Sequence, residues 1–305
     1  MTSDNRAAAG RQIMVTVAFV LLGTLLGAVL GFGLIAAAGY DFATVQREGY
    51  GVLSPDVLAG VLAANQACGY LLPGIAASVL LYRGDWLRGV HLTPPPGFGK
   101  LAIGLVAFAG TLYLTGALAA LNASVDLAGW QAEVESDVAE LLDRLINREG
   151  VFGFATAIAL VAVLPALGEE LVFRGLLQPA IVVRVGSPHL GIWITGLAFG
   201  LVHMQFAGIL PRVFLGVVLG FLAFYSQRLW VPIVAHALFN GAQVAAVRAG
   251  ALDAELPAQA PPPEVTTVLL GLALAIGSLY FLLPLTRPEA PPPDAGGESP
   301  TFPAA

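Results

Sequence analysis

The chain carries, inside a long apolar region, the stretch Leu167-Gly168-Glu169-Glu170-Leu171-Val172-Phe173-Arg174. Two adjacent carboxylates and an arginine therefore lie where a membrane interior is expected. An ionisable side chain at the centre of a transmembrane helix costs about 2.5–3.5 kcal/mol on an insertion scale. Three such groups within six positions indicate side chains that pair with one another or act on a bound molecule.

The composition is that of a polytopic membrane protein. The 305 residues are 57% hydrophobic and only 11% charged, whereas about a quarter of the residues in a soluble domain are charged. The net charge of −6 and the lack of any basic run exclude a nucleic-acid partner. The single cysteine, Cys68, excludes an internal disulfide and a cysteine metal cluster. The first apolar run, 13–39, is too long for a cleaved signal and is expected to remain as a membrane anchor.

The apolar segments predict an all-α, polytopic bundle of about eight transmembrane helices, since each span needs about 20 mainly apolar residues. The predicted spans lie near 13–38, 57–82, 101–121, 150–168, 189–205, 210–226, 230–248 and 265–285. Glycines at every fourth position of the first span, from Gly23 to Gly31, favour close helix packing. Pro165 and Gly168 are expected to interrupt the fourth span.

Residues 130–149 predict an amphipathic helix between the third and fourth spans. One face is apolar and the other is acidic. Because membrane-surface helices are generally basic, we interpret this segment as a solvated connector packed on the bundle, with a surface helix as the alternative. The proline-rich pieces 94–96 and 261–263 and the tail from Pro288 are predicted to be loops or disordered ends.

The loop charges predict a multi-pass protein of the cell membrane with both termini in the cytoplasm, because cytoplasmic loops carry more Lys and Arg. With the N-terminus inside, eight basic residues are cytoplasmic: Arg6, Arg11, Arg83, Arg88, Lys100, Arg184, Arg228 and Arg287. Five lie on the opposite side, leaving out Arg174: Arg47, Arg144, Arg148, Arg212 and Arg248.

Helical spacing gives the two glutamates different roles. Glu170 and Arg174 are four residues apart and share a helix face, where a bidentate contact would neutralise both charges. Glu169 is about 100° around the helix from Glu170 and lacks a partner on its own helix. Since a desolvated carboxylate is a good general base, we expect Glu170 with Arg174 to be structural and Glu169 to perform chemistry.

Two histidines complete a candidate polar site. His203 ends the segment that begins at Phe199, and His236 begins the segment that ends at Asn240, so each pair shares a helix face. Glu169 with His203 could polarise a water molecule, and His236 with Asn240 could donate to an oxyanion. Alternatively, Glu169, His203 and His236 could bind a divalent metal such as zinc. The zincin pattern is absent, and no serine or cysteine nucleophile stands out.

The ordered motifs EExxxR, FxxxH and HxxxN resemble those of the CPBP family, which comprises the CAAX proteases and bacteriocin-processing enzymes, often labelled Abi. The resemblance covers about residues 150–250. It implies an intramembrane endopeptidase that acts on membrane-associated peptide or protein substrates, with CAAX-type proteins as one class. In that family Glu169 and His203 would activate water, and His236 and Asn240 would form the oxyanion hole. Glu170, Arg174 and Phe199 would support them, and a metal requirement stays open.

The resemblance divides the chain into three parts: 1–149 with the first membrane helices and the acidic connector, 150–250 as the CAAX-protease-like core, and 251–305 with the last helix and tail. Hydropathy places Glu169 near the cytoplasmic end of the fourth span and His203 toward the outer end of the fifth. Either the fifth span is displaced toward the cytoplasm or the glutamate helix continues beyond Gly175. We expect the second, which would bring the two residues together. A transporter with a proton relay and a non-catalytic scaffold are the alternatives, although no inverted repeat supports transport.

Overall fold

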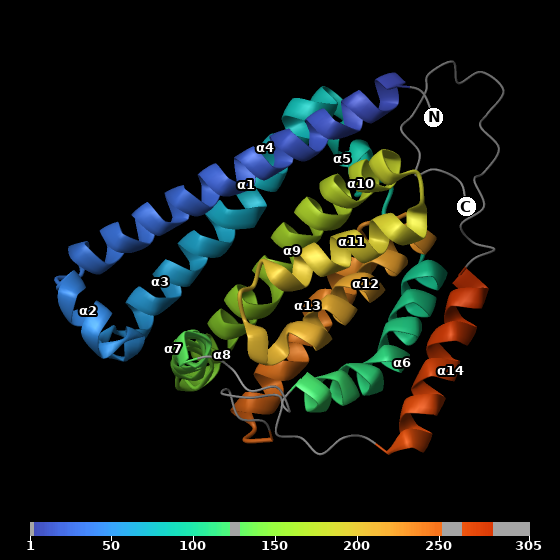
Figure 1. Ribbon diagram of the computed structural model, residues 1–305. Helices are drawn as coiled ribbons and strands as arrows, with labels where there is room; N and C mark the ends of the chain where they lie inside the picture. The colour runs from blue at the N-terminus through green and yellow to red at the C-terminus, as the bar shows by residue number, and fades with distance from the viewer. Residues whose placement is uncertain (1–2, 123–128, 252–263, 283–305) are drawn as a thin grey trace.

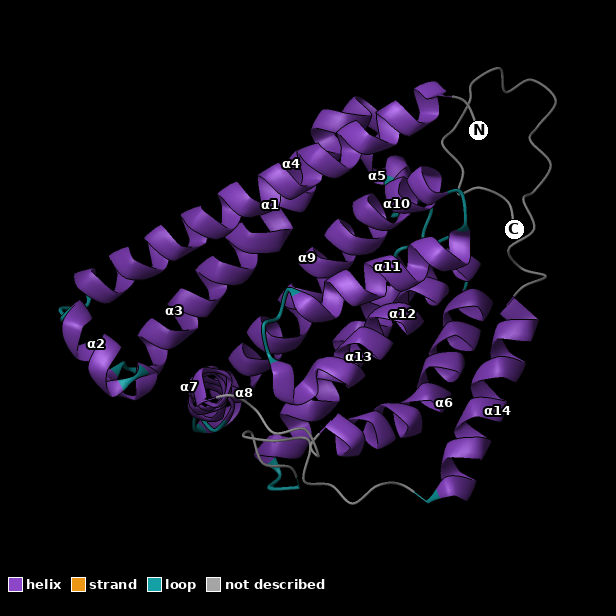
Figure 2. Ribbon diagram, viewed as in Figure 1, coloured by secondary structure: helices purple, strands orange, loops and turns teal. Residues whose placement is uncertain are grey.

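The computed structural model describes residues 3–122, 129–251 and 264–282, which are helical and contain no strand (Figures 1 and 2). The helices are α1 (Ser3–Ala37), α2 (Phe42–Glu48), α3 (Pro55–Gln66), α4 (Leu72–Tyr82), α5 (Trp86–Gly89), α6 (Phe98–Asn122), α7 (Gly129–Ile146), α8 (Gly150–Ala157), α9 (Leu164–Glu170), α10 (Gln178–Val185), α11 (Pro188–Leu201), α12 (Ile209–Ser226), α13 (Trp230–Arg248) and α14 (Val265–Leu282). Three π-helical segments join some of them without a break: η2 (Ala67–Leu71), η4 (Ile158–Val163) and η5 (Leu171–Leu177). Short 3-10 turns are η1 (Tyr50–Val52), η3 (Arg83–Asp85) and η6 (Phe206–Gly208).

The predicted all-α membrane bundle is confirmed. Within the described residues, six helical runs are long and apolar enough to cross a membrane: Ser3–Ala37, Pro55–Gly89, Phe98–Asn122, Gly150–Val185, Phe206–Ser226 and Trp230–Arg248. The fifth predicted span is the shorter apolar helix α11, and the eighth is α14. Figure 1 shows α1, α3 and α4 on one flank, α9 to α13 in the middle, and α6 with α14 on the other flank.

The predicted interruption at Pro165 and Gly168 is wrong, because the helix runs continuously from Gly150 to Val185. Pro165 lies two residues after the end of η4, just as Pro73 follows η2 and Pro179 follows η5. Proline has no N–H and its ring clashes with the carbonyl four residues earlier. Each π segment contains that carbonyl, and its wider turn accommodates the proline where a break was expected. The same continuity confirms that the glutamate helix extends beyond Gly175.

Glycines let neighbouring helices approach closely. On α1, a side chain at Gly23 would overlap the Cys68 carbonyl, so the predicted glycine face of the first span packs on the continuous helix formed by α3 and η2. On α9, a Cβ at Gly168 would lie 2.8 Å from the backbone N of Leu71. Backbones at this separation hold η2 directly beside the turn that carries the two glutamates.

The acidic connector is the helix α7, and it packs on the end of the bundle against α3, α8 and α13. Leu145 and Ile146 are buried, whereas Asp137 and Asp143 are exposed. These contacts show a connector packed on the bundle, and whether it lies at the membrane surface stays a prediction. Of the predicted proline-rich loops, 94–96 is a loop as expected. Residues 261–263 and the C-terminal tail lie outside the described residues.

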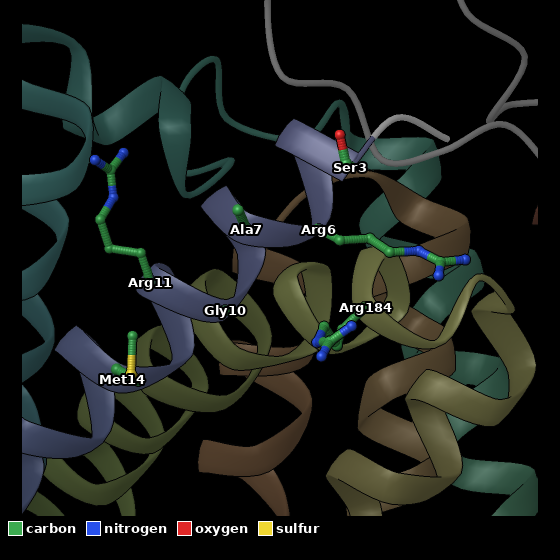
Figure 3. A pocket seen from close by; sticks show the side chains of 7 residues that line it. All are labelled: Ser3, Arg6, Ala7, Gly10, Arg11, Met14 and Arg184. Atoms are coloured by element: carbon green, nitrogen blue, oxygen red, sulfur yellow. The ribbon is translucent and has the colours of Figure 1, made fainter.

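Three of the arginines assigned to the cytoplasmic side lie at one end of the bundle. They line a surface pocket of about 460 Å³ between the start of α1 and the end of α10, together with Ser3, Ala7, Gly10 and Met14. In Figure 3, Arg6 and Arg184 lie near each other, whereas Arg11 points away from both. The pocket is a basic rim of the bundle and is lined by none of the predicted site residues.

Candidate functional site

The polar site is built on one continuous helix. Glu169 and Glu170 end α9, and the π turn of η5 begins at the next residue and contains Arg174. Glu170 and Arg174 are fully buried, and Glu169 is only 4% exposed. Burial of this kind requires charge partners, because an unpaired ion in an apolar interior is costly.

Glu170 has two cationic or polar partners on its Oε1. Arg174 Nη1 lies 2.8 Å from this oxygen, and His236 Nδ1 lies 2.9 Å from it. The second guanidinium nitrogen of Arg174, Nη2, donates to the Gly216 carbonyl at 2.7 Å. The Glu170–Arg174 pair is therefore present as predicted, but the bidentate contact is not. Arg174 divides its donors between Glu170 and α12, and so ties the glutamate helix to its neighbour.

Glu169 faces the other way, toward His203. His203 Nε2 lies 3.8 Å from Glu169 Oε2, which has no hydrogen-bond partner among the described residues. The expectation that the longer helix brings these residues together is confirmed. His203 Nδ1 donates to the Phe199 carbonyl at 2.7 Å, since a carbonyl can only accept. In the neutral ring, Nε2 consequently carries a lone pair toward Glu169.

The Phe199 ring lies between the two histidines of the site and contacts both. Its ring centroid lies 5.0 Å from that of His203 and 5.7 Å from that of His236. The guanidinium carbon of Arg174 lies 4.5 Å from the same centroid, a cation–π distance. The supporting role predicted for Phe199 agrees with this position between both histidines and the buried arginine.

Asn240 contacts the backbone of η4. Its Nδ2 donates to the Val161 carbonyl at 3.3 Å. Val161 lies four residues before Pro165, so this is the carbonyl that the proline leaves without its α-helical donor. The contact explains part of the need for asparagine at this position, and the second amide hydrogen of Asn240 has no described partner.

One supporting residue was missed from the sequence. Gln178 is fully buried, and its Nε2 donates to the Gly220 carbonyl at 3.0 Å. It repeats, one turn further on, the contact that Arg174 makes with Gly216. Gln178 lies four residues after Arg174, so the polar face of this helix could have been traced one step further.

The described residues do not support a metal centre. No group of three His, Cys, Asp or Glu side chains among them has an arrangement that could hold a metal ion. Of the three predicted ligands, Glu169 and His203 face each other, and His236 bonds to Glu170 through Nδ1. Glu169, His203 and His236 therefore form no three-ligand group in the described part of the chain, and the zinc alternative stays an untested prediction.

These features define a polytopic helical membrane protein with a buried carboxylate–histidine site. Residues 151–242 match the family model described as Type II CAAX prenyl endopeptidase Rce1-like. This segment contains Glu169, Glu170, Arg174, Phe199, His203, His236 and Asn240. This match confirms the resemblance to the CPBP family over these residues, and it supports protease activity in a multi-pass membrane protein. No curated protein and no solved structure matches the chain.

Proposed function

We propose that the protein is an intramembrane endopeptidase in which Glu169 and His203 activate the hydrolytic water. The observation that carries this proposal is the 3.8 Å separation of His203 Nε2 and Glu169 Oε2. Both atoms are acceptors when the histidine is neutral, and they are too far apart for a direct hydrogen bond. A single water placed against both would donate one hydrogen to each, which leaves a lone pair of its oxygen for attack.

The step requires only these side chains and water. The water oxygen attacks the peptide carbonyl carbon while Glu169 accepts a proton, and the carbonyl oxygen becomes an oxyanion. The C–N bond then breaks as the protonated Glu169 returns the proton to the leaving nitrogen. The products are a carboxyl group and an amine, and the site is regenerated.

His236 and Asn240 are proposed to stabilise the oxyanion. His236 donates Nδ1–H to Glu170, so its Nε2 can donate only when the ring is an imidazolium. We assign this Nε2–H to the oxyanion, with Nδ1 held 2.9 Å from Glu170 Oε1. Asn240 uses one amide hydrogen for Val161, and the other is the one assigned to the oxyanion. Donors held in place in this way stabilise charge as it develops.

Substrates are proposed to be membrane-associated peptides or proteins, with CAAX-type C-termini as one class. We also propose that both termini lie in the cytoplasm, as the arginine distribution predicts. The division of the chain into 1–149, 150–250 and 251–305 remains a prediction, and the matched segment lies inside the second part.

The test uses the full chain in lipid vesicles and fluorogenic peptides that end in a CAAX-type sequence, with and without a prenyl group. Glu169→Gln keeps the shape of the side chain and removes the base, so cleavage should fall by about 10²–10⁴-fold. Asp137→Asn is the control. It also removes one negative charge, but at an exposed position on α7, and it should leave the rate unchanged. Cleavage by Glu169→Gln at the parent rate would refute the mechanism.

A further inference from the structure

His203 lies at the start of the connection between α11 and α12, and this connection is held from three sides. Glu135 of α7 accepts a hydrogen bond from the Ala207 N–H at 2.9 Å through Oε1. Asn122, the last residue of α6, donates to the Phe206 carbonyl at 2.8 Å and accepts from the Leu210 N–H at 2.9 Å. Side chains distant in sequence therefore fix the backbone of a short connection that carries a predicted catalytic group.

The third contact comes from α12 itself. Arg212 Nη1 donates to the Gln205 carbonyl at 2.9 Å, two residues after His203. The Arg212 guanidinium interacts electrostatically with both Glu135 and Glu169. Glu135 thus fixes the connection directly and also balances the charge of the arginine beside it.

Small movements of this connection matter because His203 has one anchor in its own helix, the Phe199 carbonyl at 2.7 Å. Met204 follows with a positive φ of 53°, a backbone conformation that non-glycine residues adopt rarely. The chain therefore turns sharply directly after His203, and the position of the turn depends on what holds its far end. Misplacing a catalytic group by about 1 Å can cost a large factor in rate.

We propose that Glu135 is a positioning residue, which holds the turn after His203 so that Nε2 faces Glu169. This inference rests on the proposed function, in which His203 and Glu169 share a water. It gives the acidic helix α7, which lies outside the matched residues 151–242, a role in the reaction. Asn122 acts on the same turn, but it is only 3% exposed, so its removal would also disturb the fold. Glu135 is half-buried and is the cleaner position to change.

The experiment compares Glu135→Ala, Glu135→Gln and Asp137→Ala in the full-length protein. The alanine variant removes the acceptor for Ala207 N–H, and kcat should fall about five- to tenfold with KM within about twofold of the parent, since one hydrogen bond is lost. Glu135→Gln retains an oxygen acceptor in the same place and should restore kcat to within about twofold. Asp137→Ala removes an acidic side chain from the exposed face of α7 and should change nothing.

Hydrogen exchange of peptides that cover residues 202–210 supplies a readout that does not depend on cleavage. Exchange should rise in Glu135→Ala and stay at the parent level in Glu135→Gln and Asp137→Ala. If the alanine variant unfolds, Glu135→Leu, which keeps much of the volume without an acceptor, replaces it. Unchanged exchange, or raised exchange with an unchanged kcat, overturns the inference about Glu135. Failure of the proposed function is distinct, because Glu169→Gln would then cleave at the parent rate.

Discussion

The two sides of the polar site differ although the glutamates that define them are adjacent in sequence. On the closed side, the side chains of Glu170 and Arg174 are both 0% exposed, and that of His236 is 3% exposed. On the open side, the side chain of His203 is 25% exposed, and its contact with Glu169 is 3.8 Å long. Closed-side groups are joined by contacts of 2.7–2.9 Å, whereas the open side keeps two acceptors apart.

This difference shows how one helix can carry both a structural ion pair and a reactive carboxylate. The paired charges of Glu170 and Arg174 neutralise each other and fasten α12, although Glu170 Oε2 and Arg174 Nε have no hydrogen-bond partner among the described residues. Glu169 Oε2 also has no hydrogen-bond partner, and unlike Glu170 its carboxylate has no ion pair shorter than the 3.8 Å contact with His203, which is costly unless a solvent molecule or a substrate uses the oxygen. Variants of the closed side should therefore lower stability, and variants of the open side should lower activity with little effect on stability.

The largest expected effect on stability comes from breaking the closed side. Arg174→Met leaves the buried Glu170 with only His236 as partner and should lower the free energy of unfolding by about 3–5 kcal/mol. Asp56→Asn is the control, since Asp56 pairs with Arg148 at 2.6 Å but its side chain is 85% exposed. That change should cost less than about 1 kcal/mol. Unfolding in detergent, followed by circular dichroism, measures both.

The double variant Glu170→Gln/Arg174→Met sharpens the same comparison. Removing both charges leaves no uncompensated ion, so the double variant should be more stable than Arg174→Met alone. A double variant as unstable as the single one would show that Arg174 stabilises the fold through Gly216 and its packing on Phe199, and not through the ion pair.

A smaller, pH-dependent effect arises outside both sides of the site. Burial, and next the charge of Arg228, lower the pKa of His91 to about 4 from 6.5. His91 lies in the connection between α5 and α6, outside the membrane-spanning runs. Because its neutral form is favoured in the folded protein, stability is fully present above pH 6.5 and declines as the pH falls toward 4. The loss is at most about 3 kcal/mol over this interval.

His91→Asn removes the titrating group and suits the positive φ of 58° at this position. The variant should show a smaller loss of stability between pH 6.5 and 4 in unfolding experiments. Identical curves for the variant and the parent would exclude His91 as the cause.

Contacts set by local geometry could be predicted from the sequence. Glu170 and Arg174 are four residues apart on one helix, and their pairing follows from the helical repeat alone. The eight apolar segments likewise followed from hydropathy, because the membrane requires length and apolarity more than particular residues. The proximity of Glu169 and His203 required one further inference, that the glutamate helix continues past Gly175.

Contacts between helices could not be predicted in the same way. A π segment inserts a residue into the turn, which rotates every later side chain around the helix axis. Pro165 reads from sequence as a helix break, so η4 and η5, which lie on either side of the glutamates, are not predicted. The contacts of His236 with Glu170 and of Asn240 with the Val161 carbonyl depend on these segments and are not predicted either.

The two histidines provide the most direct comparison of the open and closed sides, with the smallest expected effect on stability. His203→Ala loses one local hydrogen bond at a partly exposed position and should change the free energy of unfolding by less than about 1 kcal/mol. His236→Ala removes a buried partner of Glu170 and should cost about 1–3 kcal/mol. Both should lower cleavage, but only His203→Ala should do so in a protein of nearly parental stability. Unfolding and cleavage are therefore measured on the same samples. Equal destabilisation by the two changes would mean that His203 is also structural, and the distinction between the two sides would no longer hold.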